Sequence, residues 1–466
     1  YLNHTTDIDR GTGTNLRMGA DLYLNRRATL GVLVRLNTYH NPMQTPGTTT
    51  ISKYMATPTQ LQTLNKNTYR TGSAGYSLNY QWRDTAGNQW SADADFSGFD
   101  NVNTGNINTQ NTALPGSLAI NQQRVDNRIS IWALRTDYVR QMKKAGMQLE
   151  AGLKTTAAYT RNHLQAAYLH NGGMLTDTGR TNRFSYREQV NAAYITLQAT
   201  CGKWQAQLSL RGEHTRLKGN SIDLKNTTIN RPDTAYFNLF PSAFVRYAPH
   251  KHHSFGLSAS RRINRPSFQD LNPFEFLFDP YTADRGNPYL RPSYLTNAEL
   301  NYNYRGALDV TLGHSQTRDY YQSVAVQQGN RAYAEPVNIG RQYNWYLNTG
   351  IGLPVKSWWF SYNSLNTFYN SYRGSIPSGN LRQQALGMGW YTNQSFTLPK
   401  SWKLQLSSWG NIATRDALFA TKWLGSIDAS VGKSWKEGRW EAKLTVLDMA
   451  NTQRWHQTVR FANLDF

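Results

Sequence analysis

The sequence predicts an all-β protein: a transmembrane, antiparallel, up-and-down β-barrel with about eighteen strands in view. Three observations predict this fold. Apolar and polar residues alternate in many short segments, tight turns alternate with long polar segments, and aromatic residues stand beside the tight turns. A chain of 466 residues is long enough for one large closed β architecture. We expect residues 1–466 to be one domain that forms part of an outer-membrane barrel.

Alternation with a period of two marks the strands. In "TLGVLVRL" (29–36), Leu30, Val32, Val34 and Leu36 fall on one face of a strand. One apolar and one polar face are typical of a strand that has water on one side only. The same pattern recurs at 90–96, 147–154, 204–211, 253–260, 402–408 and 440–446. These segments therefore predict strands in a sheet with two different faces.

Nine short turns separate the predicted strands. We place them at 25–28, 84–89, 143–146, 201–203, 249–253, 305–306, 355–357, 399–401 and 436–439. Longer polar segments lie between them, and we predict loops at 39–65, 99–124, 159–181, 218–235 and 263–291. Short turns at one end and long loops at the other are typical of outer-membrane barrels, in which the turns are periplasmic and the loops extracellular.

Aromatic residues flank the short turns. Those that follow a turn are Trp90, Trp204, Phe255, Trp402 and Trp440, and those that precede one are Tyr23, Trp82, Tyr247 and Tyr304. Rings at matching heights predict a girdle at the membrane interface. The alternative is a soluble β-propeller or β-sandwich with core aromatics. Propeller strands are shorter and do not alternate long and short connections in this way.

A membrane sheet must close, because unpaired backbone groups are costly in hydrocarbon. Closure directs the polar faces of the strands inward. We therefore predict that Arg35, Lys154, Arg211 and Lys443 face the lumen. A barrel of about eighteen strands is too wide for side chains to fill, so it must hold water or a plug.

Charge and cysteine content exclude several classes of partner and of structural feature. The formal net charge is +21, but the basic residues are scattered and no nucleic-acid-binding motif occurs, which argues against nucleic acid as a partner. The excess of positive charge instead predicts a surface or lumen that attracts anions such as lipopolysaccharide or acidic substrates. The single cysteine, Cys201, excludes disulfides within the chain. No apolar run is long enough for a transmembrane helix.

Residues 261–292 read "RRINRPSFQDLNPFEFLFDPYTADRGNPYLRP", and their prolines interrupt any long strand. The segment resembles one shared by TonB-dependent outer-membrane receptors, and in particular it is similar to the outer-membrane β-barrel family abundant in Bacteroidota. In that family, an Arg-rich strand end leads to a loop that closes with Gly-Asn-Pro-x-Leu-x-Pro. The matching residues here are Arg261, Arg262, Arg265, Pro266, Asn272, Pro273, Gly286, Asn287, Pro288, Leu290 and Pro292.

The resemblance implies a 22-strand barrel in the outer membrane of a Gram-negative bacterium, preceded by a plug domain and a TonB box. This chain shows neither, and it opens on "YLNHTTDIDRG" without Met, so we expect a removed leader or an internal piece of a longer protein. The end, "NTQRWHQTVRFANLDF", is similar to the last extracellular segment of the family. Its alternation is imperfect, so we expect truncation there.

Two interpretations of the aromatic residues in this loop stay open. Prolines lower the entropy cost of ordering a loop, so Phe274, Phe276, Phe278 and Tyr281 are candidates for a rigid platform that faces the substrate. In the other interpretation, these rings stabilise the barrel mouth and touch no substrate.

No catalytic motif of the hydrolase, zincin, P-loop or dinucleotide type occurs, so we expect no enzyme. Residues 93–104 begin like a calcium loop but carry Thr104 where a bidentate Glu is needed. The "HKHH" turn (250–253) is better explained as a solvated turn than as a metal site. We expect no cofactor.

The predicted function is that of the barrel of a TonB-dependent active transporter, which imports a nutrient too large or too scarce for porins. Expected partners are outer-membrane lipid and lipopolysaccharide, the TonB complex through an upstream segment, and, as a further candidate, a surface lipoprotein. Two alternatives remain: a plug-free passive porin, and a secreted β-rich adhesin or carbohydrate-binding protein.

Overall fold

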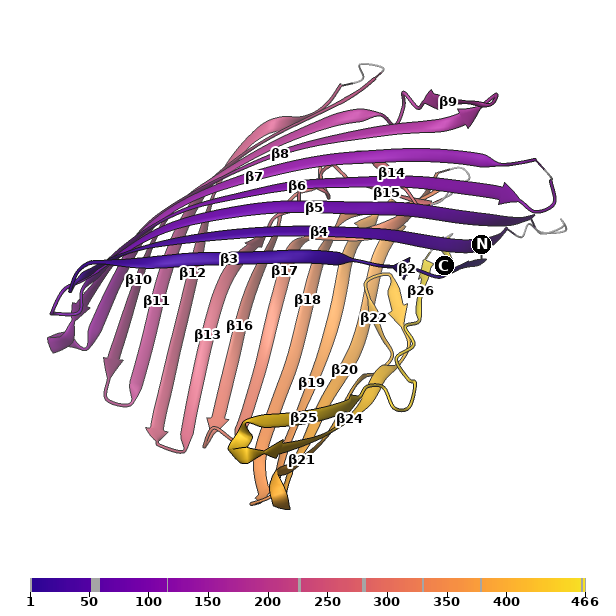
Figure 1. The fold of residues 1–466 in the computed structure, drawn as a ribbon. Helices are drawn as coiled ribbons and strands as arrows, with labels where there is room; N and C mark the ends of the chain where they lie inside the picture. Colours follow the sequence, from indigo (N-terminus) through magenta and orange to yellow (C-terminus); the bar gives the residue numbers. More distant parts are fainter. Residues whose placement is uncertain are drawn as a thin grey trace.

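The computed structural model describes residues 2–51, 59–114, 116–224, 228–278, 282–328, 331–377, 379–461 and 464–465. Eighteen long strands follow one another through a single antiparallel sheet, each paired with the next along the chain (Figure 1). This agrees with the fold class and the strand number predicted from the sequence. None of the helices in the described ranges is long and apolar enough to cross a membrane.

The first nine long strands are β3 (Thr12–Asn25), β4 (Ala28–Ile51), β5 (Thr59–Arg83), β6 (Gln89–Asn111), β7 (Ala119–Met142), β8 (Met147–His170), β10 (Asn182–Cys201), β11 (Trp204–Asp223) and β12 (Thr228–His250). The others are β13 (His253–Asn264), β16 (Ser293–Tyr304), β17 (Leu308–Gln328), β18 (Arg331–Lys356), β19 (Trp359–Ile376), β20 (Gly379–Leu398), β21 (Trp402–Asn411), β24 (Leu424–Trp435) and β25 (Trp440–Val446).

Several short strands and turns accompany the long strands. β1 (Leu2–Thr5) and β2 (Ile8–Asp9) pair with the far half of β4, and β9 (Gly173–Thr176) pairs with β8. β22 (Thr414–Asp416), β23 (Phe419–Thr421), β26 (Gln457–Phe461) and β27 (Leu464–Asp465) form a separate small sheet. The 3-10 turns η1 (Lys143–Ala145), η2 (Pro399–Ser401) and η3 (Lys436–Gly438) lie at short connections.

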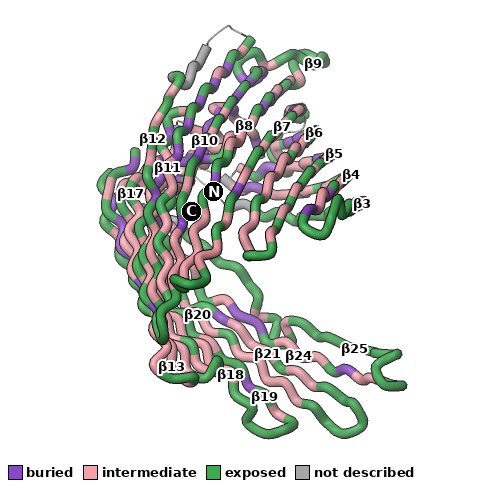
Figure 2. The backbone as a smooth tube through the Cα atoms, turned by 90° about the vertical axis from the view of Figure 1, so that its left-hand side faces the viewer, coloured by how far each residue is buried: buried purple, intermediate pink, exposed green. Residues whose placement is uncertain are grey.

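The sheet curves through most of a ring. Figure 2 shows its two ends, β3 and β25, on opposite sides of an opening. In the described part of the chain, β3 pairs only with β4 and β25 only with β24. These two strands are therefore the free edges of the sheet.

All nine predicted short turns are present, and each joins two consecutive long strands at the same end of the sheet (Figure 1). Local chemistry explains several of them. Gly146 and Gly438 have φ values of 62° and 87°, which a glycine adopts without a steric penalty.

The prediction of long loops was mostly wrong. Residues 39–51, 99–111, 159–170 and 218–223 continue β4, β6, β8 and β11. A membrane strand needs only about 9–11 residues, so strands of 24 residues such as β4 extend well beyond the hydrocarbon. Water then lies on both faces, and the apolar alternation that signals a strand is lost. Only 263–291 is largely irregular.

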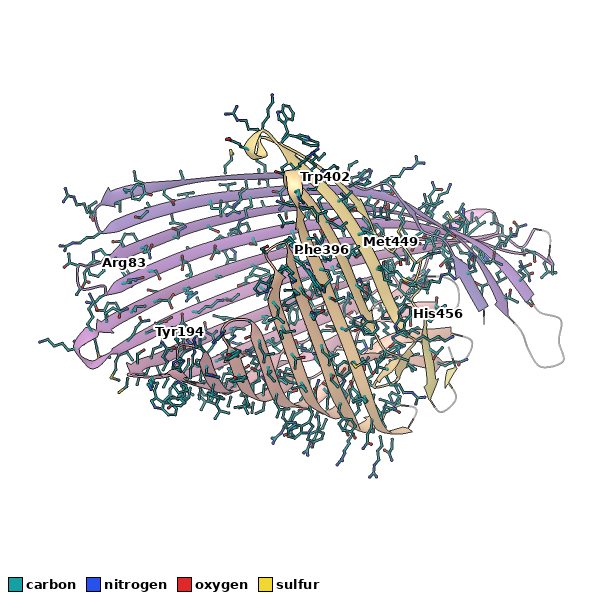
Figure 3. The ribbon with its side chains drawn as sticks, turned by 90° about the horizontal axis from the view of Figure 1, so that it is seen from below. Arg83, Tyr194, Phe396, Trp402, Met449 and His456 are labelled. Carbon is teal, nitrogen blue, oxygen red and sulfur yellow. The ribbon has the colours of Figure 1, made fainter. Side chains whose placement is uncertain are left out.

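The two faces of the sheet differ as predicted. Leu78, Leu134, Leu153 and Leu208 lie on the outer face, and between 47% and 61% of each is exposed. The inner face carries polar residues such as Asp93, which is register-paired with Arg135. Side chains project from both faces of the curved wall (Figure 3). The outward apolar band matches a hydrocarbon-facing surface.

The aromatic girdle is also present beside the short turns. Trp204 stacks on Tyr247 across the β11–β12 ladder, with 4.3 Å between ring centroids. Figure 3 labels Phe396 and Trp402, which belong to the neighbouring strands β20 and β21. Nζ of Lys433 lies 4.8 Å from the centroid of Trp402, an arrangement that keeps its charge at the edge of the apolar band.

Candidate functional site

The loop 265–292 joins β13 to β16 and folds back into the concave side of the sheet (Figure 1). Inside it, β14 (Glu275–Leu277) pairs with β15 (Thr282–Arg285), and β15 pairs in parallel with β18. Nε2 of Gln123, on the inner face of β7, donates to the carbonyl oxygen of Leu277 at 3.1 Å. The loop therefore lies against the inner wall, near the end of the sheet opposite the short turns. We call this end the long-loop end.

Apolar side chains fix this loop to the wall. Leu271, Phe274 and Leu290 are 1%, 8% and 0% exposed. They pack with Leu164 of β8, Phe184 and Tyr186 of β10, and Leu217 of β11. Burying a large apolar side chain contributes about 1.5–3 kcal/mol, so three of them hold the loop in one position.

Gly286 occupies a position that only glycine fits. A Cβ atom there would lie 2.2 Å from the carbonyl oxygen of Asn272 and 2.5 Å from that of Gln269. The two backbone segments of the loop approach closely here, and the amide of Gly286 donates to Asn272 at 2.9 Å. The amide of Asn287 donates to the carbonyl oxygen of Asp270 at 2.6 Å. The Gly-Asn element thus closes the loop onto its own first half.

Arg265 joins the loop to the wall through ion pairs. Its Nη2 lies 2.6 Å from Oε2 of Glu213 and 2.9 Å from Oγ1 of Thr215, both on β11. Its Nε lies 3.6 Å from Oε1 of Glu188 on β10. Glu213 is 7% exposed, so this ion pair is shielded from solvent. The loss of one partner from a shielded ion pair is costly, because the other charge is then left buried without compensation.

Two further arginines anchor the far end of the loop to β17 and β18. Nε of Arg285 donates to Oε2 of Glu335 at 3.1 Å, and its guanidinium lies 4.6 Å from the ring centroid of Tyr333. Nη2 of Arg291 lies 2.8 Å from Oδ1 of Asp319. The loop is therefore attached to both flanks of the wall.

The remaining residues of the family motif take different positions. Nη1 of Arg261 donates to the carbonyl oxygen of Leu239 at 3.0 Å, and its guanidinium lies over Tyr294. Arg262 is the neighbour of Arg261 on β13 and points to the opposite, inner face. Nδ2 of Asn287 donates to the carbonyl oxygen of Pro336 at 3.1 Å. Asn272, Pro266, Pro273, Pro288 and Pro292 lie in the loop itself, and of these Asn272 and Pro266 are buried.

A chain of charged and polar contacts continues from Arg265 along the inner wall. Nε of Arg211 lies 2.6 Å from Oε1 of Glu213, and its guanidinium lies 5.4 Å from the ring centroid of Tyr194. The hydroxyl of Tyr194 donates to Asp137, whose other oxygen lies 2.6 Å from Nε of Arg135. Figure 3 labels Tyr194 on this wall. The contacts span strands β7, β8, β10 and β11 without crossing the lumen.

The four basic residues predicted to face the lumen all lie on the inner face. Lys154 is register-paired with Arg135 and Ala192, and Arg211 with Tyr194. Arg35 is paired with Gly75, and Lys443 with Gly432. Only Arg211 belongs to the contact chain that leads to the loop. Arg35 and Lys443 lie near the two free edges, far along the sheet from each other.

The aromatic residues of the loop do not act together. Phe274 is buried against Phe184, with 6.1 Å between ring centroids, so it does not face the solvent as a platform would. The ring centroids of Phe276 and Phe278 are 5.8 Å apart, and Phe278 is 46% exposed. Tyr281 lies outside the described residues. Phe274 fills part of the gap between loop and wall and also lines a pocket there with Phe276, so both interpretations of the loop aromatics stay open.

A pocket of about 690 Å³ lies between the loop and the wall. Its wall side is rich in asparagine, and its loop side is formed in part by Asn272, Phe276 and Gly286. The asparagines on the wall are Asn101, Asn103, Asn127 and Asn162. This volume is in the range that holds small ligands in proteins.

The asparagines form a ladder. Asn101 of β6, Asn127 of β7 and Asn162 of β8 are direct register partners, so their side chains lie about 4.8 Å apart on one face. Asn127 and Asn162 are 7% and 9% exposed, and their Oδ1 atoms have no hydrogen-bond partner in the described part of the chain. Buried polar groups normally find a partner, so such a row indicates a surface prepared for a ligand or ordered water.

The groups considered as metal ligands do not assemble into a site. Asp93 and Asp95 lie within β6, as the alternation indicated. Rings of His250 and His252 are 5.0 Å apart at the β12–β13 turn. Across the described ranges, no three His, Cys, Asp or Glu side chains come close enough to hold a metal ion.

Comparison with known families decides the assignment. The model of the outer membrane protein β-barrel family matches residues 81–466, which is most of the chain. The chain belongs to the outer membrane protein β-barrel family. It is accordingly a protein of the Gram-negative outer membrane. No match was found among curated proteins.

Solved structures share the fold of this family member at low sequence identity. The siderophore receptor PiuA from Acinetobacter baumannii has a TM-score of 0.57 at 10% identity, covering 97% of this chain and 78% of that one. The ferric-catecholate import receptor Fiu from Escherichia coli has a TM-score of 0.56 at 10% identity, covering 98% and 79%. The ferric yersiniabactin uptake receptor FyuA from Yersinia pestis has a TM-score of 0.52 at 11% identity, covering 96% and 76%.

Sequence reasoning missed two parts of the site in this family member. The asparagine ladder was not singled out, although Asn101 and Asn103 stand two residues apart and hence on one face of a strand. Glu213, the partner of Arg265, was also missed. Its signal was a carboxylate on the inward face of β11, two residues after Arg211.

Proposed function

We propose that this chain forms the wall of a TonB-dependent active transporter, which imports a nutrient too large or too scarce for porins. The observation that carries the proposal is the inward-folded loop 265–292. It is anchored on both flanks and forms one side of a ligand-sized pocket at the inner wall. A selective importer needs such a pocket, whereas a passive porin needs a free passage.

The imported ligand is held beneath the loop in this proposal. The asparagine ladder supplies amide groups that donate and accept hydrogen bonds, and Phe276 supplies an aromatic face. Phe278 borders a smaller neighbouring pocket of about 440 Å³, which Phe276 also lines. Arg265, Gly286 and Asn287 act as positioning residues, because they hold the loop and touch its own backbone or the wall.

The basic residues of the inner face have a second role in this proposal. Arg35, Lys154 and Lys443 form no ion pair within the described part of the chain, so they are available to an anionic substrate or plug surface. Reversal of these charges is expected to slow uptake. Unchanged uptake in the charge-reversed variants would contradict this role.

Energy reaches the transporter through TonB and an upstream segment in this proposal. The likeness in fold to the siderophore receptors PiuA and Fiu supports a transporter scaffold. A surface lipoprotein remains a candidate partner at the long-loop end. Its presence is testable by purification of the intact protein from native outer membrane.

The test is a comparison of spent growth medium from three strains: wild type, a strain lacking this protein, and that strain with the gene restored. Mass spectrometry of the medium identifies each compound that is consumed. We expect at least one scarce compound to remain only where the protein is missing. Equal consumption of every compound by all three strains would contradict the proposal.

A further inference from the structure

Four arginines lie directly opposite one another on the outer face of the sheet. Arg318 of β17 is the register partner of Arg341 of β18, which is the partner of Arg373 of β19. Arg373 is in turn the partner of Arg382 of β20. We call Arg318, Arg341, Arg373 and Arg382 the arginine ladder. Like charges directly opposite each other in a sheet repel, so this arrangement costs stability unless an anion lies between them.

The ladder faces outward. On β18, Arg341 shares its face with Trp345 and Leu347, which are 52% and 39% exposed. Tyr346 points the other way, and its hydroxyl donates to Glu299 on the inner face at 2.6 Å. On β20, Arg382 shares its face with Leu386, which is 59% exposed. The ladder therefore continues the apolar band instead of lining the lumen.

No acid of this chain neutralises the ladder among the described residues. All four side chains belong to exposed residues. Asp319, the sequence neighbour of Arg318, pairs with Arg291 at 2.8 Å. The guanidinium of Arg373 lies 5.8 Å from the ring centroid of Tyr343, which leaves its N–H groups free for a further acceptor. The anion that the ladder needs must come from outside the chain.

The height of the ladder identifies its surroundings. Arg373 lies fourteen residues beyond Trp359, the first residue of β19 after its short turn. A strand tilted by about 40° rises about 35 Å over that length, whereas the apolar band of such barrels is about 25 Å tall. Arg373 therefore lies beyond the hydrocarbon and in the headgroup layer at the long-loop, extracellular side.

A second basic patch lies at the same height on the other flank. Arg161 and Lys218 stand fourteen residues beyond Met147 and Trp204, the first residues of β8 and β11. Together with Arg128 and Arg187 they line one groove on the wall. The acid beside them, Asp100, lies 3.5 Å from Arg128, and both side chains are largely exposed. Basic residues thus mark the same level on two separate parts of the wall.

We propose that the arginine ladder binds the phosphate groups of a phosphorylated glycolipid in the outer leaflet of the membrane. Guanidinium groups bind phosphate oxygens in a bidentate manner, and a row of four at strand spacing offers several such forks. The acyl chains of the lipid then lie along the apolar band that begins at Trp345 and Leu386. Charge repulsion within the ladder is relieved by the bound lipid. This inference is independent of the transported substrate.

The experiment is native mass spectrometry of the full-length protein in detergent with added lipid A, a bisphosphorylated glycolipid. The variant R341Q/R373Q removes the two central charges and keeps polar side chains of similar length. We expect its affinity for lipid A to fall about tenfold or more. A matched control, R26Q/R27Q, removes two exposed arginines at a short turn on the opposite rim and is expected to bind as the wild type does.

Two further measurements test the role of the lipid phosphates and of the arginine side chains. Wild-type protein is expected to bind dephosphorylated lipid A at least about tenfold more weakly, a comparison that needs no variant to fold. R341K/R373K, which retains the charges but lacks the guanidinium fork, is expected to bind more tightly than R341Q/R373Q and more weakly than the wild type. Equal binding by R341Q/R373Q and wild type would overturn the proposal. Displacement of lipid A by millimolar inorganic phosphate would also overturn it, because the site would then be one for a free anion.

Discussion

Arg265 and Glu213 are 52 positions apart in the sequence, yet Nη2 of the arginine lies 2.6 Å from Oε2 of the glutamate. This contact joins the loop 265–292 to the inner wall of the sheet. The side chains are 22% and 10% exposed. Because Glu213 also pairs with Arg211, the contact links the loop to the charged chain that runs down the wall.

Removal of either partner is expected to loosen the loop while the barrel stays folded. R265Q removes one of the two cations that pair with Glu213, and E213Q leaves Arg211 without its acid, at a cost of about 2–3 kcal/mol each. Rates of limited proteolysis within 265–292 measure this loosening. The double variant should cost clearly less than the sum of the two single variants. Additive costs would mean that the pair does not couple loop and wall.

Gly286→Ala tests the close approach of the two backbone segments. A Cβ atom 2.2 Å from a carbonyl oxygen forces the loop apart, so we expect a loss of about 2–4 kcal/mol in loop docking. Faster hydrogen exchange at the amides of Gly286 and Asn287 would report it. Gly173→Ala, where a Cβ would come no closer than 3.9 Å to another atom and the φ is not positive, is the control for glycine replacement. Equal exchange in G286A and wild type would remove the steric reason for this glycine.

The asparagine ladder is expected to serve function at the expense of stability. Asn127 and Asn162 have buried oxygens without partners, so N127L and N162L should leave the free energy of unfolding unchanged or raise it by about 1 kcal/mol. The same variants should weaken binding of the transported compound at least about tenfold. Chemical unfolding and equilibrium binding measure the two effects. Lower stability with unchanged binding would assign the ladder a purely structural role.

The orientation of the strands predicts opposite effects for neighbouring substitutions. Leu134 faces the lipid and is 54% exposed, whereas Ala133 faces the lumen. L134R should cost about 2–4 kcal/mol near the middle of the apolar band, and A133R should cost little. The folded fraction in the outer membrane, read from heat-modifiable migration on gels, measures both. A larger cost for A133R would reverse the assignment of the two faces.

Acid should loosen the tip between β8 and β10. Burial raises the pKa of Asp177, but its ion pair with Arg180, at 2.7 Å, and the backbone N–H groups of Arg180 and Gly179 lower that pKa by more. A carboxyl group whose pKa is lowered by folding stabilises the fold above the ordinary Asp pKa of about 3.9 and ceases to do so as pH falls through the lowered value. Pepsin cleavage at the tip should therefore increase steeply below about pH 4. D177N should be cleaved readily throughout the acid range, without that step.

Much of the fold could be predicted because short-range chemistry determines it. The turns at Gly146 and Gly438 need positive φ values, and alternation such as Leu30–Val32–Val34 reports one lipid-facing side. The extensions of β4 and β8 beyond the membrane were not predictable in this way. Water bathes both of their faces, so polar residues such as Thr48 and Thr50 stand where an apolar alternation would otherwise be.

The site was harder to predict than the fold. Gly286 was singled out by its motif, but the reason for a glycine there, the approach of Asn272, exists only in three dimensions. Glu213 and Arg265 meet because β13 returns the chain beside β12 and the loop that follows it reaches β11, which no local pattern reports. Phe274 looked like its neighbours Phe276 and Phe278, and only the packing against Phe184 separates it from them.

Energised import through this barrel is best tested by accumulation of the transported compound in whole cells with and without TonB. Uptake is measured at external concentrations far below those at which porins supply the compound. We predict accumulation that requires both this protein and TonB, and that falls to the level of the deletion strain when TonB is depleted. Uptake that depends on this protein but is unchanged after TonB depletion would contradict it and would indicate a passive pore.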